Sequence, residues 1–228
     1  MGLAGVILAA GESTRMGRDK ALLPWPADST AFEQSRSEKN LAGRVRAPAT
    51  TRAGAFSGTL LSAVIQAFTD SCDLVIVVAG KNEPAIAPIV YGCGAFLVRN
   101  PNPELGQFTS VQTGLREVLN RGRDNAMITL VDRPPPAAET LNQLLESFTN
   151  RGHGIWATVP EFEGKHGHPI LVGREMIEEF LRSPATANAR EIEHAHQQRI
   201  SYLRVDDPLV TTNVDTPEDY ASLQSQRP

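Results

Sequence analysis

The sequence has few of the features that mark several other protein classes. Its 228 residues include only two cysteines, Cys72 and Cys93, and no Cys-x-x-Cys pair, which indicates neither a disulfide framework nor a zinc cage. No apolar run approaches the roughly 20 residues that a membrane span needs, and no basic segment precedes the N-terminal apolar run as in a signal peptide. The net charge of −4 gives no general basic surface for nucleic acid. We therefore expect a cytoplasmic protein with reduced thiols that binds neither membranes nor nucleic acid.

Two common phosphate-binding motifs are also missing, although a polar loop follows the first apolar run, residues 6–9. The residue after Gly17 is Arg18, which excludes the Walker motif, and Ser13 breaks the dinucleotide pattern Gly-x-Gly-x-x-Gly. The loop still supplies flexible glycines, hydroxyl groups and cations: Gly11, Ser13, Thr14, Arg15, Gly17, Arg18 and Lys20. A loop of this kind after a buried strand predicts a site for a polyanion.

The rest of the chain alternates between buried strands and amphipathic helices. Strands are expected at residues 6–9, 74–78, 95–98, 126–131, 155–159, 169–172 and 202–205. Helices are expected at residues 60–68, 84–90, 111–119, 141–148, 175–181, 189–196 and 217–223. This alternation predicts an open, mostly parallel sheet in a single domain, residues 1–228. Residues 26–57 have no apolar period, and we interpret them as an insertion or flexible excursion within it.

Two aspartates are candidate metal ligands, one after a strand and one before the last predicted helix. Asp132 follows the strand at 126–131 and would point into the crevice above the sheet, a position that suits a metal ligand. Mg²⁺ is usually held by one or two carboxylates plus substrate phosphates, so Asp215 is the best second ligand. Each also has a structural interpretation: Asp132 could begin a proline turn, and Asp215 could help cap the helix that Thr216 and Pro217 begin.

Several motifs together resemble one family. Residues 8–23 resemble the opening motif of the MobA-like NTP transferases that make molybdenum cofactor dinucleotides, Leu-Ala-Ala/Gly-Gly-x-Ser-x-Arg-Met-Gly-x-x-Lys-x-Leu-Leu. Asp-x-Pro at 132–134 and Val-Asp-Thr-Pro-Glu-Asp at 214–219 resemble its metal-binding motifs. Asn100-Pro101 with Gly106-Gln107, and the segment 164–169, extend the match. The resemblance implies a three-layer, Rossmann-like nucleotidyltransferase fold, with helices on both faces of a mostly parallel central sheet.

The resemblance also implies a set of site residues. Nucleotide-binding positions would be Leu8, Ala9, Ala10, Gly11, Glu12, Ser13, Arg15, Lys20, Gly80, Asn100 and Ser110. Catalysis would rest on Arg15, Lys20 and Asp132, with Mg²⁺ held by Asp132 and Asp215. His168 would lie beside the acceptor, although it could equally be a packed histidine that introduces the following strand. The pairs His166/His168 and His194/His196 lack the further ligands of a zinc site.

The implied reaction is transfer of a nucleoside monophosphate from a triphosphate to a phosphorylated acceptor such as molybdopterin, with release of pyrophosphate. Ala10 resembles the cytidylyl branch and favours CTP, with GTP as the alternative donor. A molybdoenzyme or its chaperone would be a further partner. Two departures from the pattern are Val131, where relatives commonly have Gly, and the long connection at 26–57. Other hypotheses are a transferase for sugar phosphates or other small phosphates, and a nucleotide-binding regulator without turnover.

Overall fold

The computed structural model describes residues 2–11, 13–25 and 58–225, so the predicted excursion at 26–57 and the candidate Glu12 lie outside the described residues. In the described ranges eight strands form one sheet: β1 Leu3–Ala9, β2 Leu74–Ala79, β3 Phe96–Arg99, β4 Asn125–Leu130, β5 Ala157–Phe162, β6 Lys165–His166, β7 Ile170–Val172 and β8 Ile200–Arg204. The helices are α2 Leu60–Thr69, α3 Glu83–Gly92, α4 Gln107–Asn120, α5 Ala138–Thr149, α6 Arg174–Arg182, α7 Ala189–Ala195 and α8 Pro217–Ser225.

The sheet is mostly parallel, with a reversed segment toward one end. Its strand order is β3-β2-β1-β4-β7-β5-β6, and β8 pairs with β5. β1 runs parallel to β2 and β4, whereas β7 is antiparallel to both β4 and β5. Two successive reversals restore the direction, so β5 and β8 run the same way as β1. The carboxyl ends of β1, β2 and β4 therefore meet at one edge, where open α/β sheets bind ligands.

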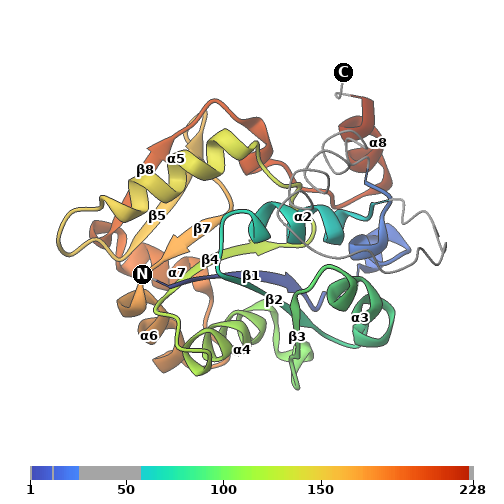
Figure 1. Cartoon of the computed structure of the whole chain (residues 1–228), viewed down its shortest axis with the longest axis horizontal. Helices are drawn as coiled ribbons and strands as arrows, with labels where there is room; N and C mark the ends of the chain where they lie inside the picture. The colour runs from blue at the N-terminus through green and yellow to red at the C-terminus, as the bar shows by residue number, and fades with distance from the viewer. Residues whose placement is uncertain (1, 12, 26–57, 226–228) are drawn as a thin grey trace, which may run out of the picture.

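Helices cover both faces of the sheet (Figure 1). On one face, Phe68 of α2 and Leu144 of α5 pack with alternate residues of β1. On the other face, Leu115 of α4 and Phe180 of α6 pack with the remaining β1 residues. A strand buried on both sides needs apolar residues at every position, which explains the continuous apolar run near the N-terminus. The predicted α/β fold with a helix layer on each face is confirmed.

The predicted elements are all present, with differences at their ends. The strand expected at 155–159 begins at Ala157 and continues to Phe162, because its later residues pair with β8. β6 was not predicted, because a strand of two residues is too short to show any period in the sequence. No helix in the described ranges has the length and apolar character to cross a bilayer.

Candidate active site

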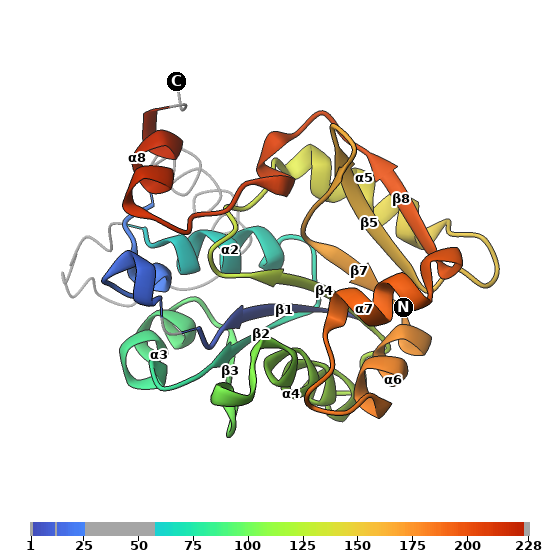
Figure 2. The same cartoon turned by 180° about the vertical axis from the view of Figure 1, so that it is seen from behind.

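Segments from four parts of the chain meet at the carboxyl edge of the sheet. Residues 10–20 follow β1, residues 80–82 follow β2, and residues 131–133 follow β4, and these three strands are neighbours. The segment before α8 returns to the same place, where the Val214 N–H donates to the Asp132 carbonyl oxygen at 2.9 Å. Figure 2 shows α8 beside the N-terminal loop, although the two are far apart in sequence. Strand pairing brings the first three segments together, and this hydrogen bond adds the segment that contains Asp215.

The loop after β1 is held by hydrogen bonds between its own residues. Ser13 has a φ of 50°, and its hydroxyl accepts a hydrogen bond from the Lys20 N–H at 3.2 Å. Gly17 has a φ of 67°, a conformation that glycine adopts without strain. The Asp19 carboxylate accepts from the Ala21 N–H at 3.0 Å and caps the short helix that begins at Lys20. The backbone of Lys20 is therefore fixed on both sides.

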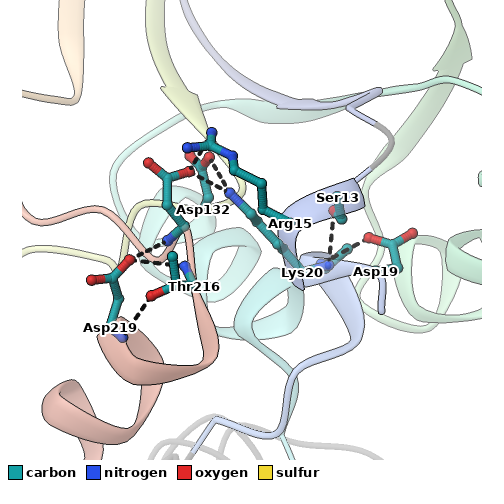
Figure 3. Close-up of polar contacts among 9 residues, drawn as sticks. Ser13, Arg15, Asp19, Lys20, Asp132, Thr216 and Asp219 are labelled. Atoms are coloured by element: carbon teal, nitrogen blue, oxygen red, sulfur yellow. Dashed lines mark hydrogen bonds and ion pairs between the residues drawn. The ribbon is translucent and has the colours of Figure 1, made fainter. Parts of the chain in front are cut away.

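The Lys20 side chain extends from this loop to both predicted metal ligands. Its Nζ lies 3.1 Å from Asp132 Oδ2 and 2.7 Å from Asp215 Oδ1. The Arg15 guanidinium lies 3.3 Å from the same Asp215 oxygen, but its side chain is 71% exposed, against 9% for Lys20. Exposed ion pairs contribute little, so Lys20 is the main counter-charge of the two carboxylates. Figure 3 shows Arg15 and Lys20 pointing together toward Asp132.

The helix cap next to Asp215 is made by other residues. The Thr216 hydroxyl accepts from the Asp219 N–H at 3.2 Å, and Asp219 Oδ2 accepts from the backbone N–H groups of Asp215 and Thr216 (Figure 3). These bonds lower the pKa of Asp219, the backbone bond from Thr216 most, and keep it ionised. The predicted capping role of Thr216 is confirmed. The alternative role of Asp215 as a cap is wrong, because its carboxylate turns to Lys20.

The loop after β1 and the two aspartates line a pocket of about 290 Å³. The predicted residues in its lining are Leu8, Ala10, Gly11, Ser13, Arg15, Lys20, Ser110, Asp132 and Asp215. Gly106 and Gln107, at the N-terminus of α4, line it as well. A helix N-terminus presents unpaired N–H groups and a partial positive charge, so this wall also favours an anion. A second pocket of about 550 Å³ borders the same loop beside Lys81.

Three other candidates for nucleotide binding lie behind the wall of this pocket. Ala9 is buried in β1. Gly80 packs against the loop, since a Cβ there would stand 2.7 Å from the Ala10 carbonyl oxygen. Asn100 is buried, and its amide nitrogen donates to Ser110 Oγ at 2.9 Å. In the described part of the chain these residues support the lining, and their direct contact with a nucleotide stays a prediction.

His168 lies two residues before β7, the strand that pairs with β4. Its Nδ1 is 3.4 Å from the Ile128 carbonyl oxygen. Burial, and next the charge of Arg133, lower its pKa to about 3, while the contact with Ile128 acts in the opposite direction. The ring is therefore neutral at physiological pH. Its predicted place beside the acceptor stays a prediction, and any contact with an acceptor would be that of a neutral group.

Arg133 is a charged residue near the site that the sequence analysis missed. It follows Asp132, and its Nη1 donates to the Val210 carbonyl oxygen at 3.4 Å. Burial lowers its pKa, and the charges of Asp132 and Asp215 raise it, so its guanidinium lies within electrostatic reach of both carboxylates. The signal in the sequence was its place as the middle residue of Asp-x-Pro.

The two aspartates suit a divalent cation that has few protein ligands. Asp132 Oδ1 is buried and has no hydrogen-bond partner within the described ranges, so one carboxylate oxygen is left without the contact it needs. In the same ranges, no three His, Cys, Asp or Glu residues gather as a metal cage. Mg²⁺ commonly takes one or two carboxylates and completes its shell with phosphates and water. The donor set fits a cation that is shared with a triphosphate.

A loop rich in glycine, hydroxyl groups and cations beside a carboxylate pair, at the carboxyl edge of parallel strands, is the arrangement expected of an α/β nucleotidyltransferase. The family comparison agrees. The MobA-like NTP transferase domain matches residues 5–200, and the chain belongs to this family.

The relatives include two kinds of molybdenum cofactor enzyme. A probable molybdenum cofactor guanylyltransferase from Mycobacterium avium (strain 104) is 26% identical over 231 residues, which cover 100% of this chain and 98% of the relative. The molybdenum cofactor cytidylyltransferase of Escherichia coli (strain K12) is 23% identical over 224 residues, covering 97% and 95%. The crystal structure of Rv0371c from Mycobacterium tuberculosis H37Rv shares the fold, with a TM-score of 0.72, 22% identity and full coverage of both chains. A complex of that protein with manganese has also been solved (TM-score 0.67, 21% identity, full coverage of both chains).

Proposed function

We propose that this protein transfers a nucleoside monophosphate from CTP to the terminal phosphate of molybdopterin and releases pyrophosphate. The observation that carries the proposal is the convergence of Asp132 and Asp215 on Lys20, beside the loop of residues 10–20. The relatives named for molybdenum cofactor transfer support the choice of acceptor. Because they include guanylyl and cytidylyl enzymes, the choice of CTP rests on Ala10 alone.

In this reaction an oxygen of the acceptor phosphate attacks the α-phosphorus of the triphosphate. A bond from that oxygen to phosphorus forms, and the bond from the α-phosphorus to the oxygen that bridges it to the β-phosphate breaks. The acceptor phosphate is already anionic, so no strong general base is required. The protein's task is to align two polyanions and to neutralise their charge.

The site residues divide this task between them. The loop backbone and Ser13 would orient the triphosphate, and Arg15 and Lys20 would neutralise its outer phosphates. Asp132 and Asp215 would hold Mg²⁺, which supplies charge neutralisation at the α-phosphate when bound. Lys20 already neutralises both carboxylates, so its charge opposes the binding of a cation to their remaining oxygens. A triphosphate offers this lysine a new anionic partner, so cation and nucleotide should bind cooperatively.

The test is pyrophosphate release from CTP, GTP, ATP and UTP, without acceptor, with molybdopterin and with sugar phosphates, followed by mass spectrometry of the product. We expect a cytidylylated acceptor only in the reaction with CTP and acceptor together. Asp132→Asn should lower the rate of this reaction. Asp70→Asn is its matched control, since Asp70 follows α2 at the opposite edge of the sheet. If GTP alone among the four gave product, the proposed donor would change from CTP to GTP. Product only with sugar phosphates would refute molybdopterin as the acceptor. Tight nucleotide binding without product under every condition would favour a regulator.

A further inference from the structure

Asn82 lies at the start of α3 and uses its whole amide group to hold the loop of residues 10–20. Its Nδ2 donates to the Ala9 carbonyl oxygen at 2.9 Å and to Asp19 Oδ2 at 2.7 Å. Its Oδ1 accepts from the Gly80 N–H at 3.1 Å. A primary amide has two N–H donors and one carbonyl acceptor, so each of these groups is engaged.

The two residues that accept from Nδ2 stand at opposite ends of the loop. Ala9 is the last residue of β1, where the loop begins, and Asp19 directly precedes Lys20, where it ends. One side chain from the neighbouring strand connection therefore ties the entrance of the loop to its exit. The missing side chain of Gly80 allows the Ala10 backbone to approach closely at the same place.

This arrangement replaces the ordinary role of an asparagine at this position. Asn82 is the N-cap residue of α3, where its side chain could accept from the first free N–H groups of the helix, yet it makes no such bond. A capping bond of this type contributes about 1 kcal/mol. The side chain instead turns to the loop, so local helix stability does not account for its position.

The contact with Asp19 reaches Lys20 through one further hydrogen bond. Asp19 uses its other carboxylate oxygen to cap the short helix that Lys20 begins, through the Ala21 N–H. Asn82 thus fixes the rotamer of a side chain that in turn fixes the backbone of Lys20. The Lys20 ammonium must reach two carboxylates, at 2.7 and 3.1 Å, so a small shift of its backbone changes both distances.

We infer that Asn82 is a positioning residue, which sets the span of the loop and places Lys20 for its phosphate and carboxylate partners. The inference rests on the proposed function, because it takes the loop to be the triphosphate site. Asn82 need not touch the nucleotide's reacting atoms. Its loss should weaken nucleotide binding through Lys20 while the sheet and helices stay folded.

The experiment measures binding of CTP, GTP, ATP and UTP in the presence of Mg²⁺ and without acceptor, by isothermal titration calorimetry. We expect Asn82→Leu to raise the Kd of the nucleotide that wild type binds by about 10-fold or more. Combined with Lys20→Met, the same substitution should add less than about 2-fold, because the residue through which it acts is already gone. Asn142→Leu, an exposed asparagine on α5, controls for the change of side chain. Circular dichroism and thermal melts verify folding.

A second pair of variants keeps the inference testable if Asn82→Leu folds poorly. Asn82→Asp keeps the acceptor for Gly80 but sets a carboxylate against Asp19, and it should also weaken binding. Adding Asp19→Asn restores a donor between the two side chains and should recover part of the lost affinity. Unchanged nucleotide affinity in both position 82 variants, or equal losses with and without Lys20, would overturn the inference. A wild-type protein that binds none of the four triphosphates would instead overturn the proposed function.

Discussion

Replacement of Lys20 by methionine should increase the affinity of the nucleotide-free protein for Mn²⁺. In the present structure the ammonium group lies between Asp132 and Asp215, at 3.1 and 2.7 Å from their oxygens, and its positive charge repels a cation that binds the same carboxylates. Two unit charges about 4 Å apart interact by about 4 kcal/mol at an effective dielectric constant near 20. The carboxylates are 22% and 29% exposed, so solvent reduces this value, and hydration of the free cation reduces it further. We expect the affinity of the variant for Mn²⁺ to rise by about 10- to 100-fold.

The assay is Mn²⁺ titration followed by electron paramagnetic resonance, without nucleotide. Arg18→Met removes the same charge from the same loop and should change the affinity by less than about 2-fold. The same Lys20→Met variant should lose activity, because the triphosphate loses a cation. A variant that binds Mn²⁺ no tighter than wild type would refute the idea that Lys20 competes with the cation. The measurement needs no acceptor, so it stands apart from the identity of the substrates.

Three other substitutions test the site and its surroundings. Asp132→Ala should lower kcat for pyrophosphate release by about 10² to 10³ or more, as loss of one electrostatic contact does, and wild-type rates with Mg²⁺ would contradict the assignment. Burial lowers the pKa of His168 to about 3, so below pH 6.5 this histidine takes up a proton when the protein unfolds. The free energy of unfolding should therefore fall by about 2 kcal/mol between pH 6.5 and 5. His168→Gln should flatten that slope in urea titrations, and parallel slopes would argue against a buried neutral ring. Burial raises the pKa of Glu193 to about 7, so the folded protein holds this proton more tightly than the unfolded chain does. The free energy of unfolding therefore falls as pH rises from 4.5 to 7. Glu193→Gln should therefore stabilise the protein by about 1 to 3 kcal/mol at pH 8 and hardly at all at pH 4.5, and equal effects at both pH values would contradict this.

The fold could be predicted because its elements carry strong local patterns. β1 and β2 are buried on both faces, so nearly every position is apolar, and α2 and α4 place their apolar residues on one side. The two-residue strand β6 has no such pattern and was missed. The ends of β5 depend on pairing with β8, a partner that lies far away in the sequence.

The sequence predicted most residues of the candidate site but only some of the contacts between them. The residue types of the loop and the two aspartates were visible as motifs. Asn82 was not, because an asparagine before a helix is normally a cap and its contact with Asp19 spans 63 positions. Arg133 was missed because the sequence places it beside Asp132 but does not show that Asp215 lies near it as well.

The sequence by itself determined an α/β chain with a loop of glycines, hydroxyl groups and cations after its first strand, since strand burial and loop composition depend on neighbouring residues. Only the tertiary structure decided that Lys20 meets Asp132 and Asp215, which lie 112 and 195 positions away. It also excluded one of the two roles that the local sequence allowed for Asp215, that of a helix cap. Thr216 and Asp219 cap α8, and this leaves the Asp215 carboxylate to face the loop. Such choices depend on which segments the sheet brings together, and no short stretch of sequence contains that information.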